Sequence, residues 1–302
     1  MIENVLVVGG SGFIGSHVVR RLTARGLRVT VPTRRRERAK DLTLIPTVSI
    51  VEADVHDEAA LAKLCAGHDA VVNLVGILKG GKGEPFGAGF AAAHVELAGR
   101  VARSARRAGL EHMVQISALK AAADAPSGYL RSKAAGEAAV RAGFPDATIV
   151  RPSVVFGAGD SFLSLFARLL TFTPVFPLAS PNAQFQPIWV CNVADVVVEA
   201  LLRPEAGGKT YELCGPRIYT LRELVQYTAR VTRRRRFVLG LSPSLSWMQA
   251  RAMELVGGPM TRDNLRSMSV PNVCGDDCAL PFGLAAAALE DVAPRYLGRP
   301  SR

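Results

Sequence analysis

The sequence predicts an α/β fold with a doubly wound parallel sheet and a smaller, mainly helical C-terminal lobe. Short apolar segments alternate with amphipathic helical segments over the first half of the chain, and a glycine-rich turn directly follows the first apolar segment. After residue 151 this alternation loosens, and proline and glycine interrupt the pattern. We therefore expect a Rossmann domain over residues 1–157 and 188–215, and a lobe that shapes the substrate site over residues 158–187 and 216–302.

Each expected strand is a short apolar run rich in β-branched residues, followed by a turn or an amphipathic helix. The strands are expected at residues 4–8, 28–31, 48–51, 70–74, 112–116 and 147–150. Helices are expected at residues 13–24, where Gly26 ends the helix, and at residues 92–108 and 128–141. Successive parallel strands require crossover helices, so this order predicts a sheet covered on both faces.

The second half of the chain is less regular. Residues 161–170 are amphipathic, whereas residues 174–187 are rich in proline and are expected to be irregular. Residues 188–202 and 209–213 return to a strand–helix–strand pattern, and helices separated by proline and glycine are expected from residue 221 onward. This change in pattern is why we expect a separate, mainly helical lobe.

The composition is that of a globular protein with a substantial core, since 49% of the 302 residues are hydrophobic and 21% are charged. The chain enters an apolar strand at once, without a basic region or a cleavage site, so we do not expect secretion. The longest apolar stretch, residues 162–178, is interrupted by Arg168, Pro174 and Pro177, and a bilayer span needs about 20 mostly apolar residues. We expect a cytoplasmic protein, with attachment to the inner face of the membrane as the alternative.

The five cysteines are scattered through the chain, and we expect all of them to be reduced thiols: Cys65, Cys191, Cys214, Cys274 and Cys278. Cys274 and Cys278 lie four residues apart, which is not the spacing of a zinc knuckle, and no paired histidines accompany them. No metal site is expected.

The formal net charge is +11, and two arginine clusters contribute much of it. One comprises residues 34–36 with Arg38 and Lys40, and the other comprises residues 233–236. Basic surfaces attract nucleic acids, anionic lipids or acidic cofactors. Neither cluster is interleaved with aromatic residues, and no nucleic-acid-binding motif is present, so we expect no nucleic-acid partner. The second cluster is expected to be a solvated surface.

A glycine-rich turn with the spacing G-x-x-G-x-x-G connects the first strand to the first helix. Gly9 permits a tight turn, Gly12 lets the backbone approach a diphosphate, and Gly15 lets the helix pack against the strand. Free N–H groups at the helix N-terminus would then bind the anion. The turn could instead lack a ligand, but its place between a strand and an amphipathic helix favours a dinucleotide. The residues expected to contact the dinucleotide are Gly9, Ser11, Gly12, Phe13, Ile14 and Gly15.

The end of the second strand indicates which dinucleotide binds. Proteins that bind NAD(H) carry an acidic residue there, which accepts hydrogen bonds from the ribose hydroxyls. This segment instead reads VPTRRR over residues 31–36. Arg34 and Arg35 could hold a 2′-phosphate through charge-assisted hydrogen bonds. NADP(H) is therefore favoured, and NAD(H) is the alternative if these arginines only face solvent.

Two further strand ends are expected near the cofactor. Asp54 follows the third strand, where it could hydrogen-bond the adenine amino group with Val55 beside it. Asn73, Val75 and Gly76 follow at the end of the fourth strand, where the chain would pass beneath the cofactor. Without this context, both sets could equally be turn residues that cap a strand.

Ser117, Tyr129 and Lys133 are the predicted catalytic residues. Ser117 ends the fifth strand, and Tyr129 and Lys133 lie four residues apart on one face of the next expected helix. A phenol with a pKa of about 10 is a poor base near neutral pH, and a nearby ammonium should lower that pKa. Tyr129 would exchange a proton with a substrate oxygen while hydride moves to or from a nicotinamide. Ser117 would hydrogen-bond the same oxygen, and Lys133 would also hold the nicotinamide ribose.

Together these residues resemble the extended, or atypical, short-chain dehydrogenases/reductases, which include the NAD-dependent epimerases and dehydratases. The resemblance covers nearly the whole chain, and its further motifs are RPS at residues 151–153, FQPIWV at 185–190, VADV at 193–196 and GKTYEL at 208–213. Residues 259–265, which read PMTRDNL, are similar to bacterial relatives of the NAD(P)H-binding accessory subunit of respiratory complex I.

The resemblance implies roles for several further residues. Pro152 and Val154 would flank the nicotinamide, and Asp195 would belong to an interdomain segment. The wider family often has an asparagine on the helix before the fifth strand, and the nearest residue here is His94. His94 would complete the site in its place, or would simply be a helix residue facing the core or solvent. The complex I subunit uses its nucleotide for structure more than for turnover. In this chain Ser117, Tyr129 and Lys133 are all present, so catalysis is expected to be possible.

Three functions follow from these observations. The first is a reductase, dehydrogenase or epimerase-like enzyme acting on a carbonyl, a secondary alcohol or a sugar-nucleotide-like substrate. The second is an NADP(H)-binding regulator or assembly factor with little or no catalysis. The third is a peripheral membrane or quinone-associated protein, for which the apolar face within residues 162–170 would be the contact. Burial of that face in the C-terminal lobe is the favoured interpretation. The sequence indicates neither the substrate nor the oligomeric state.

Overall fold

The structure is a computed structural model that describes residues 2–275 and 279–298, and it forms two compact units. Unit 1 comprises Met1–Arg151, Cys191–Glu212 and Pro281–Leu284. Unit 2 comprises Pro152–Val190, Leu213–Leu280 and Ala285–Arg302. The chain crosses from one unit to the other several times, so each unit is built from segments that are distant in the sequence.

A seven-stranded sheet forms the centre of unit 1, with the strand order β11-β6-β5-β4-β1-β2-β3. Its strands are β1 (Asn4–Val8), β2 (Arg28–Thr33), β3 (Val48–Glu52), β4 (Ala70–Asn73), β5 (His112–Ile116), β6 (Thr148–Pro152) and β11 (Thr210–Leu213). β1 runs parallel to both of its neighbours, with Val5 opposite Val29 of β2 and Ala70 of β4. The predicted doubly wound parallel sheet is confirmed, and β2 extends to Thr33 instead of ending at residue 31.

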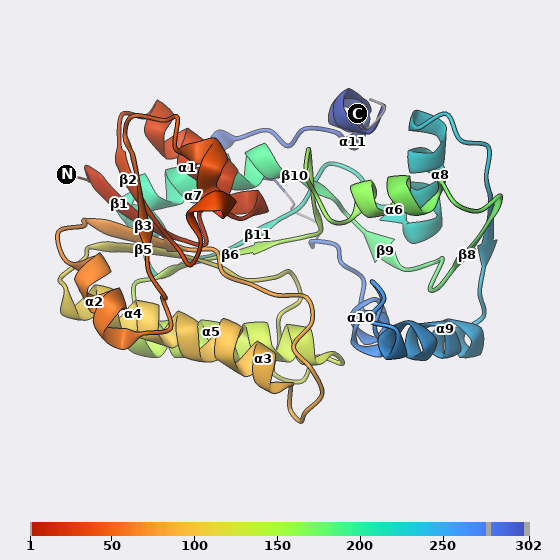
Figure 1. The fold of residues 1–302 in the computed structure, drawn as a ribbon, viewed down its shortest axis with the longest axis horizontal. Coiled ribbons are helices and arrows are strands. Elements are labelled where there is room, and N and C mark those ends of the chain that lie inside the picture. Colours follow the sequence, from red (N-terminus) through yellow and green to blue (C-terminus); the bar gives the residue numbers. More distant parts are fainter. Residues whose placement is uncertain (1, 276–278, 299–302) are drawn as a thin grey trace. The chain divides into compact units, whose positions relative to one another are not determined.

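Helices cover both faces of this sheet (Figure 1). α1 (Phe13–Ala24) and α7 (Val190–Leu202) lie side by side on one face, where Arg21 pairs with Asp195 at 2.8 Å. The helices on the other face are α2 (Glu58–Cys65), α4 (Leu97–Arg107) and α5 (Gly128–Gly143). Three 3₁₀-helical segments also belong to unit 1, namely η1 (Arg36–Leu42), η3 (Pro204–Ala206) and η4 (Pro281–Gly283).

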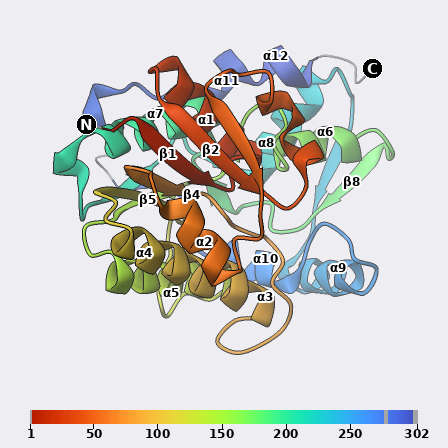
Figure 2. The same cartoon turned by 60° about the vertical axis from the view of Figure 1, so that its left-hand side comes forward.

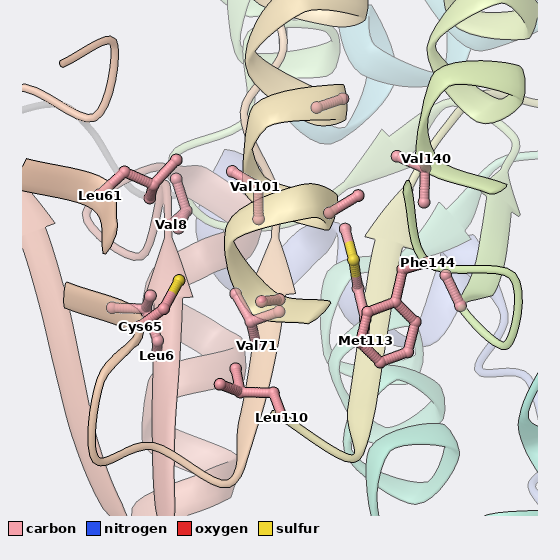
Figure 3. Close-up of a cluster of buried hydrophobic side chains, with 14 of the residues drawn as sticks. Leu6, Val8, Leu61, Cys65, Val71, Val101, Leu110, Met113, Val140 and Phe144 are labelled. Atoms are coloured by element: carbon pink, nitrogen blue, oxygen red, sulfur yellow. The ribbon is translucent and has the colours of Figure 1, made fainter. Parts of the chain in front are cut away.

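A core cluster of unit 1 lies between the sheet and the layer of α2, α4 and α5 (Figure 3). Leu6 and Met113 from the strands pack there with Leu61 of α2, Val101 of α4 and Phe144 of α5, and all five are buried. Burying an aliphatic or aromatic side chain of this size contributes about 1.5–3 kcal/mol. This layer therefore fixes the ends of β1, β4 and β5 relative to α5, and those ends carry the candidate site.

The helix predicted over residues 92–108 has an irregular beginning. α3 (Ala88–Phe90) continues into a π-helical turn, η2 (Ala91–Glu96), and only then into α4. Such turns frequently occur at functional sites. This one carries His94, which is buried and contacts Ser132 of α5.

Unit 2 contains short paired strands and several helices, and the predicted helical C-terminal lobe is confirmed. Its strands are β7 (Val155–Phe156), β8 (Val175–Leu178), β9 (Gln184–Phe185), β10 (Ile188–Trp189), β12 (Tyr219–Thr220) and β13 (Phe237–Gly240). Its helices are α6 (Leu163–Leu169), α8 (Leu221–Val231), α9 (Pro243–Leu255), α10 (Arg262–Ser267), α11 (Leu289–Val292) and α12 (Pro294–Leu297). Residues 174–187 were expected to be irregular, yet they contain β8 and β9. These strands form because distant partners, β13 and β12, pair with them.

The apolar face of α6 is buried inside unit 2. Leu163, Phe166 and Leu170 pack in one cluster with Leu221 and Leu224 of α8. The favoured interpretation of this face, burial in the C-terminal lobe, is confirmed for Leu163, Phe166 and Leu170, whereas Leu165 and Leu169 are partly exposed. Within residues 2–275 and 279–298, none of the helices combines the length and apolarity needed to cross a bilayer.

The expectation that all cysteines are reduced thiols is wrong for two of them. Cys214 and Cys274 form a disulfide within unit 2, across a sequence separation of 60. Gln186 links the two chain segments, because its Nε2 donates to Gly215 O at 2.8 Å and its Oε1 accepts from Cys274 N at 3.0 Å. Cys65 and Cys191 are free thiols, and Cys278 lies outside the described residues.

Candidate functional site

The glycine-rich turn between β1 and α1 has the geometry of an anion cradle. Gly9 adopts a left-handed conformation with φ of +83°, and Gly12 N–H donates to Gly9 O at 3.0 Å, which closes the turn. A Cβ atom on Gly15 would lie 2.2 Å from Gly9 O, so only glycine lets α1 start this close to β1. No side chain caps α1 and its first turn holds no acidic residue, which leaves the N-terminal amides available to an anion.

This cradle lies at the point where the strand order reverses. β1 is flanked by β2 on one side and by β4 on the other, and ligands of open α/β sheets bind at the carboxyl ends of strands at such a point. Gly9 packs directly against the chain that follows β4, since its Cβ position would lie 3.1 Å from Val75 N. The structure therefore brings together the predicted glycine loop and the predicted segment of Asn73, Val75 and Gly76.

Asn73 itself has a structural task. Its side-chain Nδ2 donates to Gln115 Oε1 of β5 at 2.8 Å, and its Oδ1 accepts from Val75 N at 3.3 Å. The side chain is fully buried. Asn73 thus ties the ends of β4 and β5 together, and in this segment the backbone of Val75 and Gly76 is what borders the cradle.

The ends of β2 and β3 carry the remaining cofactor residues predicted in unit 1. Arg34 and Arg35 follow β2, are exposed, and make no ion pair within the described part of the chain. Thr33 shapes this turn, since its hydroxyl donates to Arg35 O at 3.0 Å. Asp54 follows β3 and is also exposed, and its carboxylate accepts from His56 N at 3.0 Å, while Val55 packs partly against the core.

Ser117 lies just beyond β5 and is buried, with its N–H donating to Val150 O at 2.8 Å. Its Oγ has no hydrogen-bond partner among the described residues. A buried hydroxyl without a partner is unusual in native proteins and indicates a ligand or a catalytic role.

Lys133 of α5 is buried next to the ends of β4 and β5. Its Nζ donates to Ile116 O at 3.4 Å, one residue before Ser117, and lies 3.1 Å from the Cβ position of Gly76. Tyr129, one turn earlier on α5, packs against Ala118 and the segment that follows it. The structure thus gathers the predicted trio at the same sheet edge as the glycine loop.

Burial is the largest cause of the pKa shifts of Tyr129 and Lys133. Burial raises the pKa of Tyr129 to about 12, and burial lowers the pKa of Lys133 to about 8 although the carboxylate of Glu137 opposes that shift. The expectation of a lowered pKa for the Tyr129 phenol is therefore wrong, because loss of hydration raises that pKa. Near neutral pH, Tyr129 is a protonated phenol and Lys133 an ammonium, so Tyr129 is suited to donate a proton.

His94 supports the trio from η2. Ser132 Oγ donates to Tyr129 O at 2.7 Å, so it must accept from His94 Nδ1, which lies 2.8 Å away. His94 Nε2 accepts from Ile77 N at 3.0 Å. These contacts fix a neutral ring with its proton on Nδ1. Burial, with the charge of Lys133 as a second cause, lowers the pKa of His94 to about 3.

Aromatic rings surround Tyr129. Phe90 of α3 stacks on His94 with ring centroids 5.2 Å apart, and both rings meet the Tyr129 ring edge-on at 6.0 and 5.7 Å. Sequence patterns did not single out Phe90, because its role depends on the π-helical turn. The rings limit the orientations open to the Tyr129 phenol.

The resemblance also implied roles for Pro152, Val154 and Asp195. Pro152 ends β6 and Val154 follows it in unit 2, where Val154 N donates to Asn272 Oδ1 at 3.0 Å. Asp195 lies on α7 in unit 1 and pairs with Arg21. Across residues 2–275 and 279–298 no group of three or more histidine, cysteine or acidic residues could hold a metal ion.

Comparison with known families identifies the kind of protein that carries this geometry. Residues 5–214 match the family described as the NAD dependent epimerase/dehydratase family. The chain belongs to this family. The resemblance inferred from the motifs is confirmed, and the family is NAD(P)-dependent.

Curated relatives extend this result. The protein of Mus musculus named NADH dehydrogenase (ubiquinone) 1 alpha subcomplex subunit 9, mitochondrial is 34% identical over 234 residues, covering 76% of this chain and 61% of that protein. The protein of Caulobacter vibrioides named ceramide reductase is 34% identical over 204 residues, covering 67% of this chain and 62% of that protein. The chain thus spans about three fifths of the length of these relatives.

Solved structures show the same fold. The UDP-glucose 4-epimerase of Thermus thermophilus, solved as a complex with NAD, has a TM-score of 0.64 at 21% identity, covering 82% of this chain and 92% of that one. At this identity the likeness concerns the fold alone.

Proposed function

We propose that the protein is an NADP(H)-dependent oxidoreductase that reduces a carbonyl group, or oxidises the corresponding secondary alcohol, through Tyr129, Lys133 and Ser117. The observation that carries this proposal is the buried Ser117 hydroxyl without a partner in the described chain, next to the buried Lys133 ammonium. Most buried hydroxyls in native proteins have a hydrogen-bond partner, so this hydroxyl supports a contact with a bound ligand.

The residues present fit a dinucleotide. The amides at the start of α1 face a cradle that a Cβ at Gly15 would close, and Gly9 and Gly12 leave its floor open. The residues that would hold the diphosphate are those of the turn, with Ser11, Phe13 and Ile14 around the glycines. The backbone of Val75 and Gly76 would border the cofactor, and Pro152 and Val154 are proposed to flank the nicotinamide. Bound there, the nicotinamide would supply or accept hydride.

The chain's own residues would then handle the proton. Tyr129 would donate its phenol proton to the substrate oxygen as that oxygen gains charge, and Ser117 would donate a hydrogen bond to the same oxygen. The Lys133 ammonium would stabilise the phenolate that remains and would hold the ribose. Since burial raises the pKa of Tyr129 to about 12, the phenol is protonated near neutral pH, which is the form that carbonyl reduction requires.

Substitution of Tyr129 tests this mechanism. The Tyr129→Phe variant should lose at least about 100-fold of NADPH-dependent carbonyl reduction, because general acid catalysis contributes about that much or more. The matched control is Tyr211→Phe, a tyrosine of β11 whose ring packs on Phe282 in the same unit. Equal turnover by the wild type and by Tyr129→Phe across a panel of aldehydes, ketones and sugar nucleotides would refute the proposal.

We propose NADP(H) over NAD(H) because two exposed arginines, Arg34 and Arg35, stand where NAD-binding proteins carry a carboxylate. The double variant Arg34→Ser with Arg35→Ser should weaken NADPH binding by about tenfold or more and leave NADH binding nearly unchanged. Arg38→Ser, in η1, is the control. Isothermal titration with both coenzymes measures the effect, and tighter binding of NADH than NADPH by the wild type would contradict the assignment.

A second candidate function is an NADP(H)-binding accessory or assembly protein with little turnover. The name of the mouse relative, a subunit of a mitochondrial NADH dehydrogenase (ubiquinone), favours it, and we propose association with such a complex at a membrane. For this candidate NADPH raises the melting temperature of wild type and Tyr129→Phe alike, and no carbonyl in the panel oxidises the bound NADPH. Oxidation that depends on Tyr129 would exclude it.

A further inference from the structure

Unit 2 carries exposed apolar side chains that its own core does not use, on the ribbon of β8 and β13 and on α9. Figure 2 shows β8 and α9. We call this surface the ribbon–helix face and define it by Val175, Phe237, Leu239, Leu245, Met248 and Leu255. We propose that the ribbon–helix face binds the surface of a bilayer that contains anionic lipid. The proposal goes beyond the proposed function and does not rest on it.

The ribbon contributes apolar side chains on both of its faces. β8 and β13 pair so that Phe237 lies opposite Val175 and Leu239 lies opposite Pro177. The alternate residue Val238 is buried in the core of unit 2, so its neighbours Phe237 and Leu239 point outward. Phe237 is 66% exposed. An outward strand face is ordinarily polar, and this one is not.

α9 has its amphipathic pattern reversed. Its buried positions, Ser246 and Ala250, are small and lie four residues apart. Leu245, Met248 and Leu255 follow at spacings of three and seven residues, which places them on one stripe, and they are 46%, 62% and 82% exposed. A surface helix normally directs its large apolar residues inward. α9 instead exposes them, which indicates a partner.

The ribbon and the helix form one continuous surface. Leu241 N, just beyond β13, donates to Leu178 O of β8 at 2.9 Å. Gln249 of α9 donates from Nε2 to Pro177 O at 3.1 Å. α9 is therefore held directly against β8, so the exposed apolar side chains of the helix and of the ribbon lie on adjacent elements.

The charges around this surface select an anionic partner. Residues 224–253 contain six arginines and no acidic residue, and residues 161–190 contain Arg168 and no acidic residue. Arg233, Arg235 and Arg251 are exposed and form no ion pair within the described part of unit 2. The arginine cluster that sequence patterns assigned to a solvated surface thus directly precedes β13.

A bilayer with anionic lipid can bind both the exposed apolar side chains and the exposed arginines of this surface. The apolar stripe can enter the headgroup boundary while the arginines contact lipid phosphates, as in helices that lie in the membrane interface. Each arginine near an anionic surface raises affinity by about fivefold. A second copy of the chain fits less well, because a symmetric contact would bring the same arginines together.

Vesicle flotation of the whole protein tests the proposal. The probes are vesicles of phosphatidylcholine alone and vesicles with about one quarter phosphatidylglycerol. The wild type should float with the anionic vesicles at low salt, should lose most of this binding at about 1 M salt, and should not float with phosphatidylcholine alone. Failure to float with anionic vesicles at low salt would overturn the proposal.

Two sets of variants locate the contact. Leu245→Ser with Met248→Ser should reduce binding at least about tenfold, and Arg233→Gln with Arg235→Gln should do so by about 20-fold. The control is Leu44→Ser, which removes a leucine of unit 1 that is 88% exposed. Near-UV circular dichroism checks that each variant is folded. Undiminished flotation of both folded variants would overturn the proposal, as would a stable dimer of the wild type that the serine variant dissociates.

Discussion

At the scale of single residues, Ser117 holds a buried hydroxyl that has no hydrogen-bond partner among the described residues. Such a group costs the folded state about 1–3 kcal/mol of lost hydration. Ser117→Ala should therefore keep or raise the free energy of unfolding, by about 1 kcal/mol, while it lowers carbonyl reduction by about 100-fold. Urea denaturation and steady-state kinetics measure the two effects.

The control for this prediction is another buried serine of unit 1. Ser127 caps α5, where its hydroxyl accepts from Leu130 N at 3.2 Å. Ser127→Ala should lower the free energy of unfolding by about 1 kcal/mol, in the opposite direction to Ser117→Ala. Equal losses of stability in both variants would show that the Ser117 hydroxyl serves the fold.

His94 gives a prediction about pH. Its pKa in the folded protein is lowered to about 3, whereas histidine in an unfolded chain titrates near about 6.5. Below this value the unfolded chain takes up a proton that the folded chain does not, so stability falls as the pH falls. The loss attributable to His94 reaches about 2 kcal/mol at about pH 5. In His94→Asn, the drop in unfolding free energy between neutral pH and pH 5 should be smaller by that amount.

Urea denaturation at the two pH values measures this drop in unfolding free energy for the wild type and for His94→Asn. The difference between the two drops removes the contribution of the other titrating groups, which both proteins share. The same pH dependence in wild type and His94→Asn would mean that the folded protein protonates this ring, and would contradict the Nδ1–H form. Such a result would also remove the contact from His94 to Ser132 as a fixed support of Tyr129.

Sequence patterns were most informative where a residue acts within its own local segment. The glycine loop and the spacing of Tyr129 and Lys133 were readable because a turn and a helix face are local features. The sequence did not indicate the direction in which the pKa of Tyr129 shifts. That shift depends on the hydration that Tyr129 loses when rings from α3 and η2 pack around it. For the same reason nothing in the sequence indicated that Ser117 would lack a partner.

At the scale of elements, two glycines of the turn between β1 and α1 have different roles: Gly15 is needed for the fold, and Gly12 is needed for the approach of the cofactor. A Cβ on Gly15 would lie 2.2 Å from Gly9 O, whereas a Cβ on Gly12 would come no closer than 3.2 Å to the same atom. Gly12 also has φ of −80°, which any residue adopts. Gly15→Ala should therefore destabilise the protein by about 3 kcal/mol or more, and Gly12→Ala by about 1 kcal/mol or less.

NADPH affinity should respond to Gly12→Ala, because the added methyl occupies the approach of the diphosphate. We expect a loss of about tenfold or more, measured by isothermal titration on protein whose melting curve is nearly that of the wild type. Full NADPH affinity in folded Gly12→Ala would show that the diphosphate does not sit over this turn.

Secondary structure was predictable where an element is stabilised by its own periodicity. The strands of the sheet follow from apolar runs, and the end of α1 follows from Gly26. β8 and β9 escaped prediction because a strand rich in proline forms only when a partner pairs with it, and β13 lies some 60 residues further on. The π-helical turn η2 escaped for a related reason, since no local residue type specifies it.

At the scale of the whole molecule, we expect the disulfide to stabilise unit 2 and to leave the cofactor cradle of unit 1 unaffected. Cys214 and Cys274 both belong to unit 2, and so do both tryptophans, Trp189 and Trp247. Tryptophan fluorescence therefore follows the unfolding of unit 2, whereas NADPH binding follows the cradle in unit 1. A crosslink across a separation of 60 residues restricts the unfolded chain and stabilises the fold by about 4 kcal/mol.

Cys214→Ala with Cys274→Ala, or reduction of the wild type, should therefore shift the fluorescence transition in urea to lower concentration by the equivalent of about 4 kcal/mol. NADPH affinity in the absence of urea should change little, because the glycine loop and Lys133 belong to unit 1. Cys191→Ala, which removes a free thiol, is the control and should leave the sensitivity to reductant intact. A fluorescence transition that neither reduction nor the double variant moves would mean that the two sulfurs are not joined, and the five cysteines would then be thiols as their spacing first indicated.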